Sequence, residues 1–275
     1  MVVFAVPPEQ RHDMAAHFAV ARRVAADISA HFPPPVELEF EKCYFPYLLF
    51  AKKRYCGGMY TSPGAMDGVD VKGIAFVRRD NCPLVKTASQ AVLDAIMVHK
   101  SPELAVAEAR RVVLGVLRGE YAMDQFVVSK RLASSYKQPN HPHVAVARKR
   151  QERTGAAPPV GERIPYVFVR DDDHPKGLQA EIAEDPAYAA EHGLPLDVLY
   201  YVETQLRAPL VGLLEMLEPD VDAIVFGSGE IGALLGGLRA RRTAVTAVVK
   251  RKRKNAAASQ AEITKFFAPR SGAVQ

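Results

Sequence analysis

ELEFEKCYFPYLLFAKKRYCGGMY, residues Glu37–Tyr60, carries the strongest structural signal in the chain. Apolar and acidic side chains alternate in its first five residues, so a strand would place Leu38 and Phe40 on one face and three carboxylates on the other. Like charges this close repel each other, and an ordinary surface strand has no need of them. Pro46 interrupts the pairing, and Phe45–Phe50 predicts a second, more buried strand. The stretch therefore predicts a β-hairpin whose first strand has an acidic face.

A charged tetrapeptide, KKRY, follows the buried strand and comes just before Gly57-Gly58. Alternation points Lys53 and Tyr55 to one side, and Lys52 and Arg54 to the other. Taken without its neighbours, a charged tetrapeptide of this kind would be interpreted as the solvated end of a strand. Their position beside two glycines, which let another backbone approach, favours a site that grips a nucleic-acid backbone and its base edges.

Composition excludes several classes of protein. The 275 residues are 48% hydrophobic and 24% charged, as in an ordinary globular protein. No apolar run approaches the roughly 20 residues of a membrane span, and the amino terminus lacks a secretion signal. The cysteines Cys43, Cys56 and Cys82 are scattered without a C-x-x-C pair, which argues against a structural zinc or iron–sulfur site.

The net charge of +5 is unevenly distributed along the chain. The last 39 residues, from Gly237, hold ten Lys or Arg and one acid, which leaves 26 basic and 30 acidic residues elsewhere. The body is therefore slightly acidic, at −4, and any contact with nucleic acid there must come from local patches.

Patterns beyond the hairpin predict mostly helices. Ser101-Pro102-Glu103 combines an N-cap, a first-turn proline and an acid at the positive end of the helix dipole, and Gly119 ends that helix. A leucine stripe between residues 196 and 217 predicts a helix kinked near Pro209. Further patterns predict a helix at about Glu9–Ala30, strands at Asp124–Leu132 and Ile164–Arg170, and a helix that begins at His141-Pro142.

Several basic groups outside the hairpin are ordinary surface charges when taken singly. They can bind nucleic acid only as a group, and only if the fold brings them to one face. They are Arg78, Arg79, Lys130, Arg131, Arg148, Lys149 and Arg150.

The tail contains a more specific motif. In QAEITKFF, one helical turn would bring Ile263, Phe266 and Phe267 together, with Gln260 three residues before the isoleucine. Paired phenylalanines in a polar tail have no core to join, so a partner surface is their natural site. The spacing matches the sliding-clamp interaction box of replication proteins.

A run of five cations precedes that motif. It predicts either a nuclear import signal or a DNA-binding arm, and it is also compatible with a simply solvated segment. Its residues are Lys250, Arg251, Lys252, Arg253 and Lys254.

Four blocks, in order, resemble the carboxy-terminal part of family B DNA polymerases, nearest to the delta-type catalytic subunits and their counterparts in large DNA viruses. They are ELEFEKCYFPYLLFAKKRY, VKGIAFVRRDNCPL, YKQPNHPHVAVARKRQERTGAAPPVGERIPYVFV and LPLDVLYYVETQLRAPL. The resemblance implies an α+β chain: the end of a palm, with part of its antiparallel sheet and a hairpin, at residues 1–60, then a mostly helical thumb at residues 61–222. Residues 223–275 are expected to be a flexible, disordered basic tail with the clamp-binding box.

The resemblance also implies roles for individual residues. Lys53 and Tyr55 match the family's K-x-Y element, which holds the primer terminus, and Lys52 and Arg54 would support it. The basic groups of the thumb would grip the duplex product. Glu39 and Glu41 belong to the acidic strand beside the metal site, and Glu41 is the better candidate for an auxiliary carboxylate near Mg²⁺.

The family's catalytic aspartates lie in D-x-x-S-L-Y-P-S and Y-G-D-T-D-S, and neither motif occurs here. We therefore expect a portion of a replicative polymerase, a nucleotidyltransferase that is inactive alone and completed by an exonuclease–palm portion. A split gene or a start site further upstream would account for it. The alternative is a non-catalytic, clamp-recruited DNA-binding accessory protein derived from a polymerase. Either would act in the nucleus or in a viral replication compartment.

Overall fold

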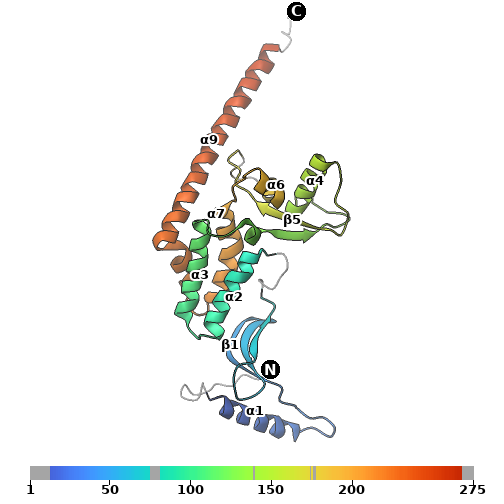
Figure 1. The fold of residues 1–275 in the computed structure, drawn as a ribbon, viewed down its shortest axis with the longest axis vertical. Coiled ribbons are helices and arrows are strands. Elements are labelled where there is room, and N and C mark those ends of the chain that lie inside the picture. Colours follow the sequence, from blue (N-terminus) through green and yellow to red (C-terminus); the bar gives the residue numbers. More distant parts are fainter. Residues whose placement is uncertain (1–12, 75–80, 139, 174, 176–177, 268–275) are drawn as a thin grey trace, which may run out of the picture.

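The computed structural model describes residues 13–74, 81–138, 140–173, 175 and 178–267, with side chains described as far as Lys252. Figure 1 shows the elements arranged along one long axis. Helix α1 (Met14–Ser29) lies at one end, followed by the sheet that contains β1. A helical body comes next, a smaller sheet with α4 and α6 lies to one side, and α9 projects beyond them. The α+β class is confirmed.

The first sheet is antiparallel, with strand order β1-β2-β3. Its strands are β1 (Cys43–Ala51), β2 (Arg54–Tyr60) and β3 (Gly68–Lys72). Pro46 does not end β1: the strand continues past it, with a register shift between Tyr44 and Tyr47. This shift is expected where a proline cannot donate a ladder hydrogen bond.

The predicted acidic strand at Glu37–Glu41 is corrected by the structure, which has no regular element there. Tertiary contacts with α1 hold this segment instead. The backbone N–H of Leu38 donates to the Ser29 hydroxyl at 2.7 Å, and the Phe40 ring packs edge-on against Phe18, with 5.0 Å between ring centroids. A segment anchored to a helix in this way cannot also pair along a sheet.

The main core lies among the helices of the body and extends to one face of each sheet. Helices α2 (Pro83–Met97) and α3 (Pro102–Leu117) pack together, and their buried residues include Leu93 and Val113. The predicted start of α3 is confirmed, since the Ser101 hydroxyl accepts from the Leu104 N–H at 3.1 Å. Gly119 follows the helix with φ of +73°, a conformation that suits glycine.

The second sheet is small and also antiparallel, with the order β4-β5-β6. It consists of β4 (Val128–Arg131), β5 (Arg163–Phe168) and β6 (Ala183–Glu184). The short elements around it are η3 (Met123–Phe126), α4 (Pro142–Thr154), α5 (Gln179–Ile182) and α6 (Pro186–Glu191). The strands and the helix predicted for this region are present, with shorter bounds.

The leucine-rich stripe forms one helical rod in three parts. They are α7 (Val198–Tyr200), a π-helical segment η4 (Tyr201–Leu206) and α8 (Arg207–Leu214). The π-helical segment ends three residues before Pro209. Because proline has no N–H, Pro209 cannot donate the helical hydrogen bond to the carbonyl of Gln205. The expected irregularity near Pro209 is therefore present as a change of helix type.

The boundary expected for the tail is corrected. A π-helical turn η5 (Ala223–Gly227) leads into the long helix α9 (Gly229–Phe267), and both contribute side chains to the core. Phe226, Ile231 and Leu235 are almost completely buried there. Burial of these side chains stabilises the first turns of α9, so the stretch that follows residue 222 is part of the folded body. Residues 268–275 lie outside the described residues.

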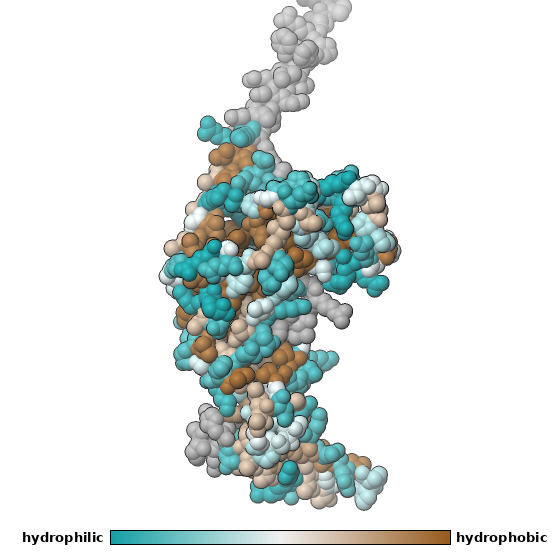
Figure 2. Space-filling view, in the orientation of Figure 1, coloured by the Kyte–Doolittle hydropathy of each residue, from teal (hydrophilic) through white to brown (hydrophobic). Residues whose placement is uncertain are grey.

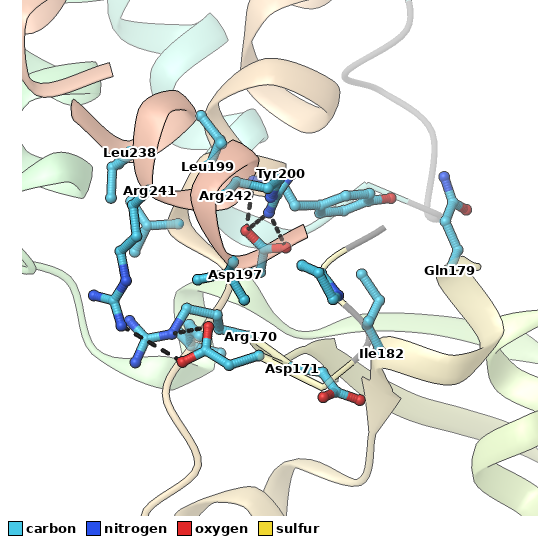
Figure 3. A pocket seen from close by; sticks show the side chains of 15 residues that line it. Arg170, Asp171, Gln179, Ile182, Asp197, Leu199, Tyr200, Leu238, Arg241 and Arg242 are labelled. Atoms are coloured by element: carbon cyan, nitrogen blue, oxygen red, sulfur yellow. Dashed lines mark hydrogen bonds and ion pairs between the residues drawn. The ribbon is translucent and has the colours of Figure 1, made fainter. Parts of the chain in front are cut away.

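Ion pairs fasten α9 to the body around a cavity of about 320 Å³ (Figure 3). Arg242 contacts both carboxylate oxygens of the buried Asp197 at 2.5 Å, and Arg239 contacts Glu203 at 2.6 Å. At the rim of the cavity, Asp172 lies between Arg170 and Arg241, at 3.5 Å from each. The cavity is therefore lined by charges that already neutralise one another.

Across the described residues, no helix is both long enough and apolar enough to cross a membrane.

Candidate nucleic-acid interface

The KKRY tetrapeptide lies at the tip of the β1–β2 hairpin. Ala51 pairs with Arg54, so Lys52 and Lys53 form a two-residue turn. Lys53 has φ of +64°, in the left-handed region that the turn requires and that few non-glycine residues adopt. Gly73, which follows β3, lets that strand's end approach the Lys53 carbonyl, where a side chain would clash. The tip is therefore a tight structure on which three exposed cations gather.

The alternation predicted through this tetrapeptide applies only from Arg54 onward, because the two lysines belong to the turn. Along β2, Cys56 faces the main core and is fully buried, so Tyr55 and Gly57 face the other side of the sheet. The sequence thus placed all four residues at one tip, and the structure defines which face Tyr55 occupies.

Tyr55 is one of three tyrosines whose rings touch on that face. Its ring centroid lies 6.1 Å from that of Tyr44 and 5.5 Å from that of Tyr47, and the latter two are 5.6 Å apart. Gly57 leaves room for the cluster, since a Cβ there would lie 3.0 Å from ring atoms of both Tyr44 and Tyr47. We call Tyr44, Tyr47 and Tyr55 the tyrosine platform.

Two residues of β3 extend the platform. Asp70 pairs with Gly57 and Lys72 pairs with Tyr55 in the ladder, which puts both on the platform's face. The Tyr44 hydroxyl donates to Asp70 Oδ2 at 2.7 Å, and Lys72 Nζ lies 3.1 Å from Asp70 Oδ1. The hydrogen bond from the Tyr44 hydroxyl, together with the hydrogen bond and positive charge of Lys72, holds the pKa of Asp70 below its ordinary value, although partial burial raises it. Asp70 is therefore a stable anion at neutral pH.

The sequence analysis missed the tyrosine platform and both β3 residues. Continuing the alternation test across the strand Gly68–Lys72 would have placed Asp70 and Lys72 on one face, but their partners depend on strand register. Figure 2 shows side chains of intermediate hydropathy at the level of this sheet, whereas the surface over α4 and α6 is largely hydrophilic.

The structure divides the basic residues predicted for the thumb into two groups. Lys130, Arg131 and Arg148 are exposed, and Arg131 Nε donates to the Gly161 carbonyl at 3.2 Å. Lys149 and Arg150 are engaged instead with acids from neighbouring elements. Arg78 and Arg79 lie outside the described residues.

The engaged group centres on Glu184 of β6, which is 5% exposed. Lys149 Nζ lies 3.3 Å from its carboxylate, and Arg153 holds both carboxylate oxygens at 2.8 and 3.0 Å. Arg150 lies 3.5 Å from both Glu162 and Asp185. These cations fasten α4 to the second sheet, which leaves less of their charge for an external partner.

The acidic candidates lie apart from any cation site. Glu39 and Glu41 are exposed, and Glu41 pairs with the ammonium of Lys42 at 3.2 Å. Within the described ranges, no three His, Cys, Asp or Glu side chains gather as metal ligands. These residues do not by themselves fit a magnesium site.

The tail motif lies on the last turns of α9, at the end that projects from the body in Figure 1. Lys250, Arg251 and Lys252 are exposed on the same helix. The side chains of Arg253, Lys254, Gln260, Ile263, Phe266 and Phe267 lie outside the described ones.

The sequence matches the model of DNA polymerase family B over residues 9–217. The chain belongs to family B of the DNA polymerases. It is 39% identical over 267 residues to a DNA polymerase of Paramecium bursaria Chlorella virus NY2A, covering 97% of this chain and 29% of the viral one. It is 36% identical over 269 residues to the DNA polymerase delta catalytic subunit of Bos taurus, covering 92% and 24%.

A solved structure agrees with this membership. The family B DNA polymerase from the hyperthermophilic archaeon Pyrobaculum calidifontis superposes with a TM-score of 0.56 at 25% identity, covering 71% of this chain and 24% of that one. The chain thus spans less than a third of the length of these family B relatives.

Proposed function

We propose that this chain is the palm-and-thumb portion of a replicative DNA-directed DNA polymerase. Its task is to hold primer–template duplex while nucleotidyl transfer uses carboxylates from outside the chain. One observation carries this proposal: in a family B chain, the KKRY residues form the tip of a tight hairpin beside the tyrosine platform.

The hairpin tip is the part that meets the primer end. Lys53 and Tyr55 would contact the terminal nucleotides, with Lys52 and Arg54 on nearby phosphates. Ammonium and guanidinium groups bind phosphate without reading sequence, and such contacts weaken steeply with salt.

The second sheet and α4 would grip the duplex further from the primer end. Lys130, Arg131 and Arg148 are the exposed cations there, and we assign them the direct contacts. Lys149 and Arg150 act mainly by holding α4 in place. Arg78 and Arg79 are proposed as duplex contacts on their sequence context alone.

Phosphoryl transfer needs divalent cations held by carboxylates. We propose that Mg²⁺ serves the complete polymerase and that the missing aspartate motifs supply its ligands. Glu41 remains a candidate auxiliary carboxylate. This chain alone is then inactive.

We further propose that Gln260, Ile263, Phe266 and Phe267 bind a sliding clamp. At helical spacing, Ile263, Phe266 and Phe267 would share one face, and the end of α9 that contains them projects from the body. The cations from Lys250 to Lys254 act either as a DNA-binding arm or as an import signal. Both uses suit a site of action in the nucleus or a viral replication compartment.

The substitution Lys53→Ala tests the primer-end assignment. We expect affinity for a primer–template junction to fall about fivefold, and affinity for blunt duplex by less than about twofold, because one charged contact specific to the junction is lost. Fluorescence anisotropy with both DNAs at a fixed salt concentration measures the two affinities.

Lys86→Ala on α2 is a matched control, since it removes the same charge from another exposed site. It should lower both affinities equally and slightly. Equal losses on both DNAs for Lys53→Ala would contradict a primer-end role.

A further inference from the structure

The tyrosine platform lies on the face of the first sheet that points away from the main core. On the opposite face, Cys56 is buried in that core, and Val69 and Val71 pack against it. The platform's hydrogen bonds therefore contribute little to the packing that holds the fold together. A cluster of partly exposed tyrosine rings on the face away from the core, in which a hydrogen bond fixes the Tyr44 hydroxyl, indicates a surface that a ligand uses.

Asp70 controls the direction of one hydroxyl group in the platform. A phenol carries one hydrogen, and Tyr44 donates it to Asp70. The Tyr44 oxygen can then only accept hydrogen bonds from other groups. The ring of Tyr44 is thereby held against Tyr55, at 6.1 Å between centroids.

Tyr55 is enclosed on its own face of the sheet. Tyr44 and Tyr47 flank its ring, and its ladder neighbours are Leu49 on β1 and Lys72 on β3. Lys72 is also the ion-pair partner of Asp70. Asp70 is therefore linked to two of these four neighbours, Tyr44 and Lys72. Tyr55 lies two residues after the hairpin turn, so these neighbours define the orientation of its ring close to the tip.

We propose that Asp70, acting through the Tyr44 hydroxyl, is a positioning residue that holds the Tyr55 ring in the orientation needed at the primer end. This inference rests on the proposed function. It adds a specific claim: the contact made by Tyr55 depends on a hydrogen bond formed by two residues that do not touch the primer.

Tyr44→Phe and Asp70→Asn test the claim on the 275-residue chain. The measured quantity is junction preference, the ratio of the dissociation constants for blunt duplex and for primer–template junction. We expect both variants to lower this ratio about threefold, because the bond that orients Tyr44 is lost or loses its charge. Tyr60→Phe is the matched control, since it removes the hydroxyl of a tyrosine on the same strand as Tyr55 that packs with Met14 and Phe18, outside the platform.

A double-mutant cycle separates positioning from mere structure. In a Tyr55→Ala background, Tyr44→Phe should produce no further loss of junction preference, because the residue that it positions is gone. Melting temperatures of the Tyr44→Phe and Asp70→Asn variants should stay within about 2 °C of the parent, since the core is untouched.

Four outcomes contradict the inference. An unchanged ratio for Tyr44→Phe and Asp70→Asn, together with a lowered ratio for Lys53→Ala, overturns the positioning claim and leaves the proposed function standing. An equal loss from Tyr60→Phe, or a further loss in the Tyr55→Ala background, also overturns it. A parent chain without any junction preference overturns both proposals.

Discussion

Glu184 shows how one residue can hold a whole sheet in place. It lies at the end of a two-residue strand and is almost fully buried, yet it is charged. Burial alone would raise the pKa of Glu184, but hydrogen bonds from Arg153 and from the N–H of Asp185, with the nearby charge of Lys149, lower it below the ordinary value. A buried carboxylate satisfied on all sides stabilises the fold only while it is ionised.

Replacing Glu184 by Gln should lower the free energy of unfolding at pH 7 by about 2 kcal/mol, because Arg153 and Lys149 lose their anionic partner. A lowered pKa means that this stability is fully present above the ordinary glutamate pKa and is lost as pH falls through the lower, folded-state value. The difference between parent and variant should therefore shrink below about pH 4.5. Urea unfolding followed by circular dichroism between pH 7 and pH 3.5 measures it.

Glu191→Gln, at an exposed position of α6, is the control and should change stability little at any pH. A difference between Glu184→Gln and the parent that stays constant across this range would show that the carboxylate's charge is not what holds the sheet.

At the scale of elements, α9 is the helix that the sequence analysis did not expect. Its basic, alanine-rich sequence resembles a disordered tail, but alanine and the long charged residues also have high helix propensity. Ile231 and Leu235 anchor its first turns, and Arg239 pairs with Glu203 of the body. Arg242 pairs with Asp197 (Figure 3). The anchored turns provide the nucleus from which a helix propagates outward.

The proposed clamp box belongs to this element. Phe266→Ala combined with Phe267→Ala should weaken binding to a sliding clamp more than tenfold, on the order expected for the loss of two aromatic anchors. DNA affinity should stay within about twofold, because no charge is removed. Surface plasmon resonance with immobilised clamp, and anisotropy with duplex DNA, measure the two affinities.

Val248→Ala removes a side chain that is 54% exposed on the same helix and serves as the control. Clamp affinity that survives the double substitution would refute the assignment of the tail motif.

The whole molecule is an elongated set of parts that presents its candidate DNA contacts at separate places. The hairpin tip lies in the first sheet, and the exposed cations Lys130, Arg131 and Arg148 lie in and beside the second sheet. The helical body separates the two sheets in Figure 1. This arrangement suits contacts spread along a duplex. The chain spans 29% or less of the relatives that it matches, so the contacts make sense as one part of a larger polymerase.

Mixing the purified chain with the complementary exonuclease–palm portion should restore primer extension that neither part shows alone, and sliding clamp should stimulate it. Extension of a labelled primer in the presence of Mg²⁺ is the measurement. In the same mixture, Lys53→Ala should reduce extension severalfold, because the primer end is held less firmly.

Intact duplex binding without any restored synthesis would instead favour the accessory-protein alternative. A pull-down with immobilised sliding clamp and the same preparation would then show whether the chain still binds the clamp.

Local features of this protein could be predicted from sequence because neighbouring residues create them. Ser101 caps α3 through the backbone three residues away, and the apolar run Phe45–Phe50 forms most of β1. The absence of the acidic strand could not be predicted in this way, since it depends on the contact between Phe40 and Phe18 of α1. The tyrosine platform also required the pairing of three strands.

By itself, then, the amino-acid sequence determined the capped start of α3, the strand around Phe45–Phe50 and the cations that follow it, because short-range propensity and alternation act within a few residues. The α+β class followed from the resemblance of the sequence to a family. Only the tertiary structure decided which cations remain exposed, which acid orients Tyr44 and where α9 begins. Those outcomes depend on groups far apart in the chain, such as Tyr44 with Asp70 and Arg242 with Asp197, whose meeting is governed by strand register and core packing.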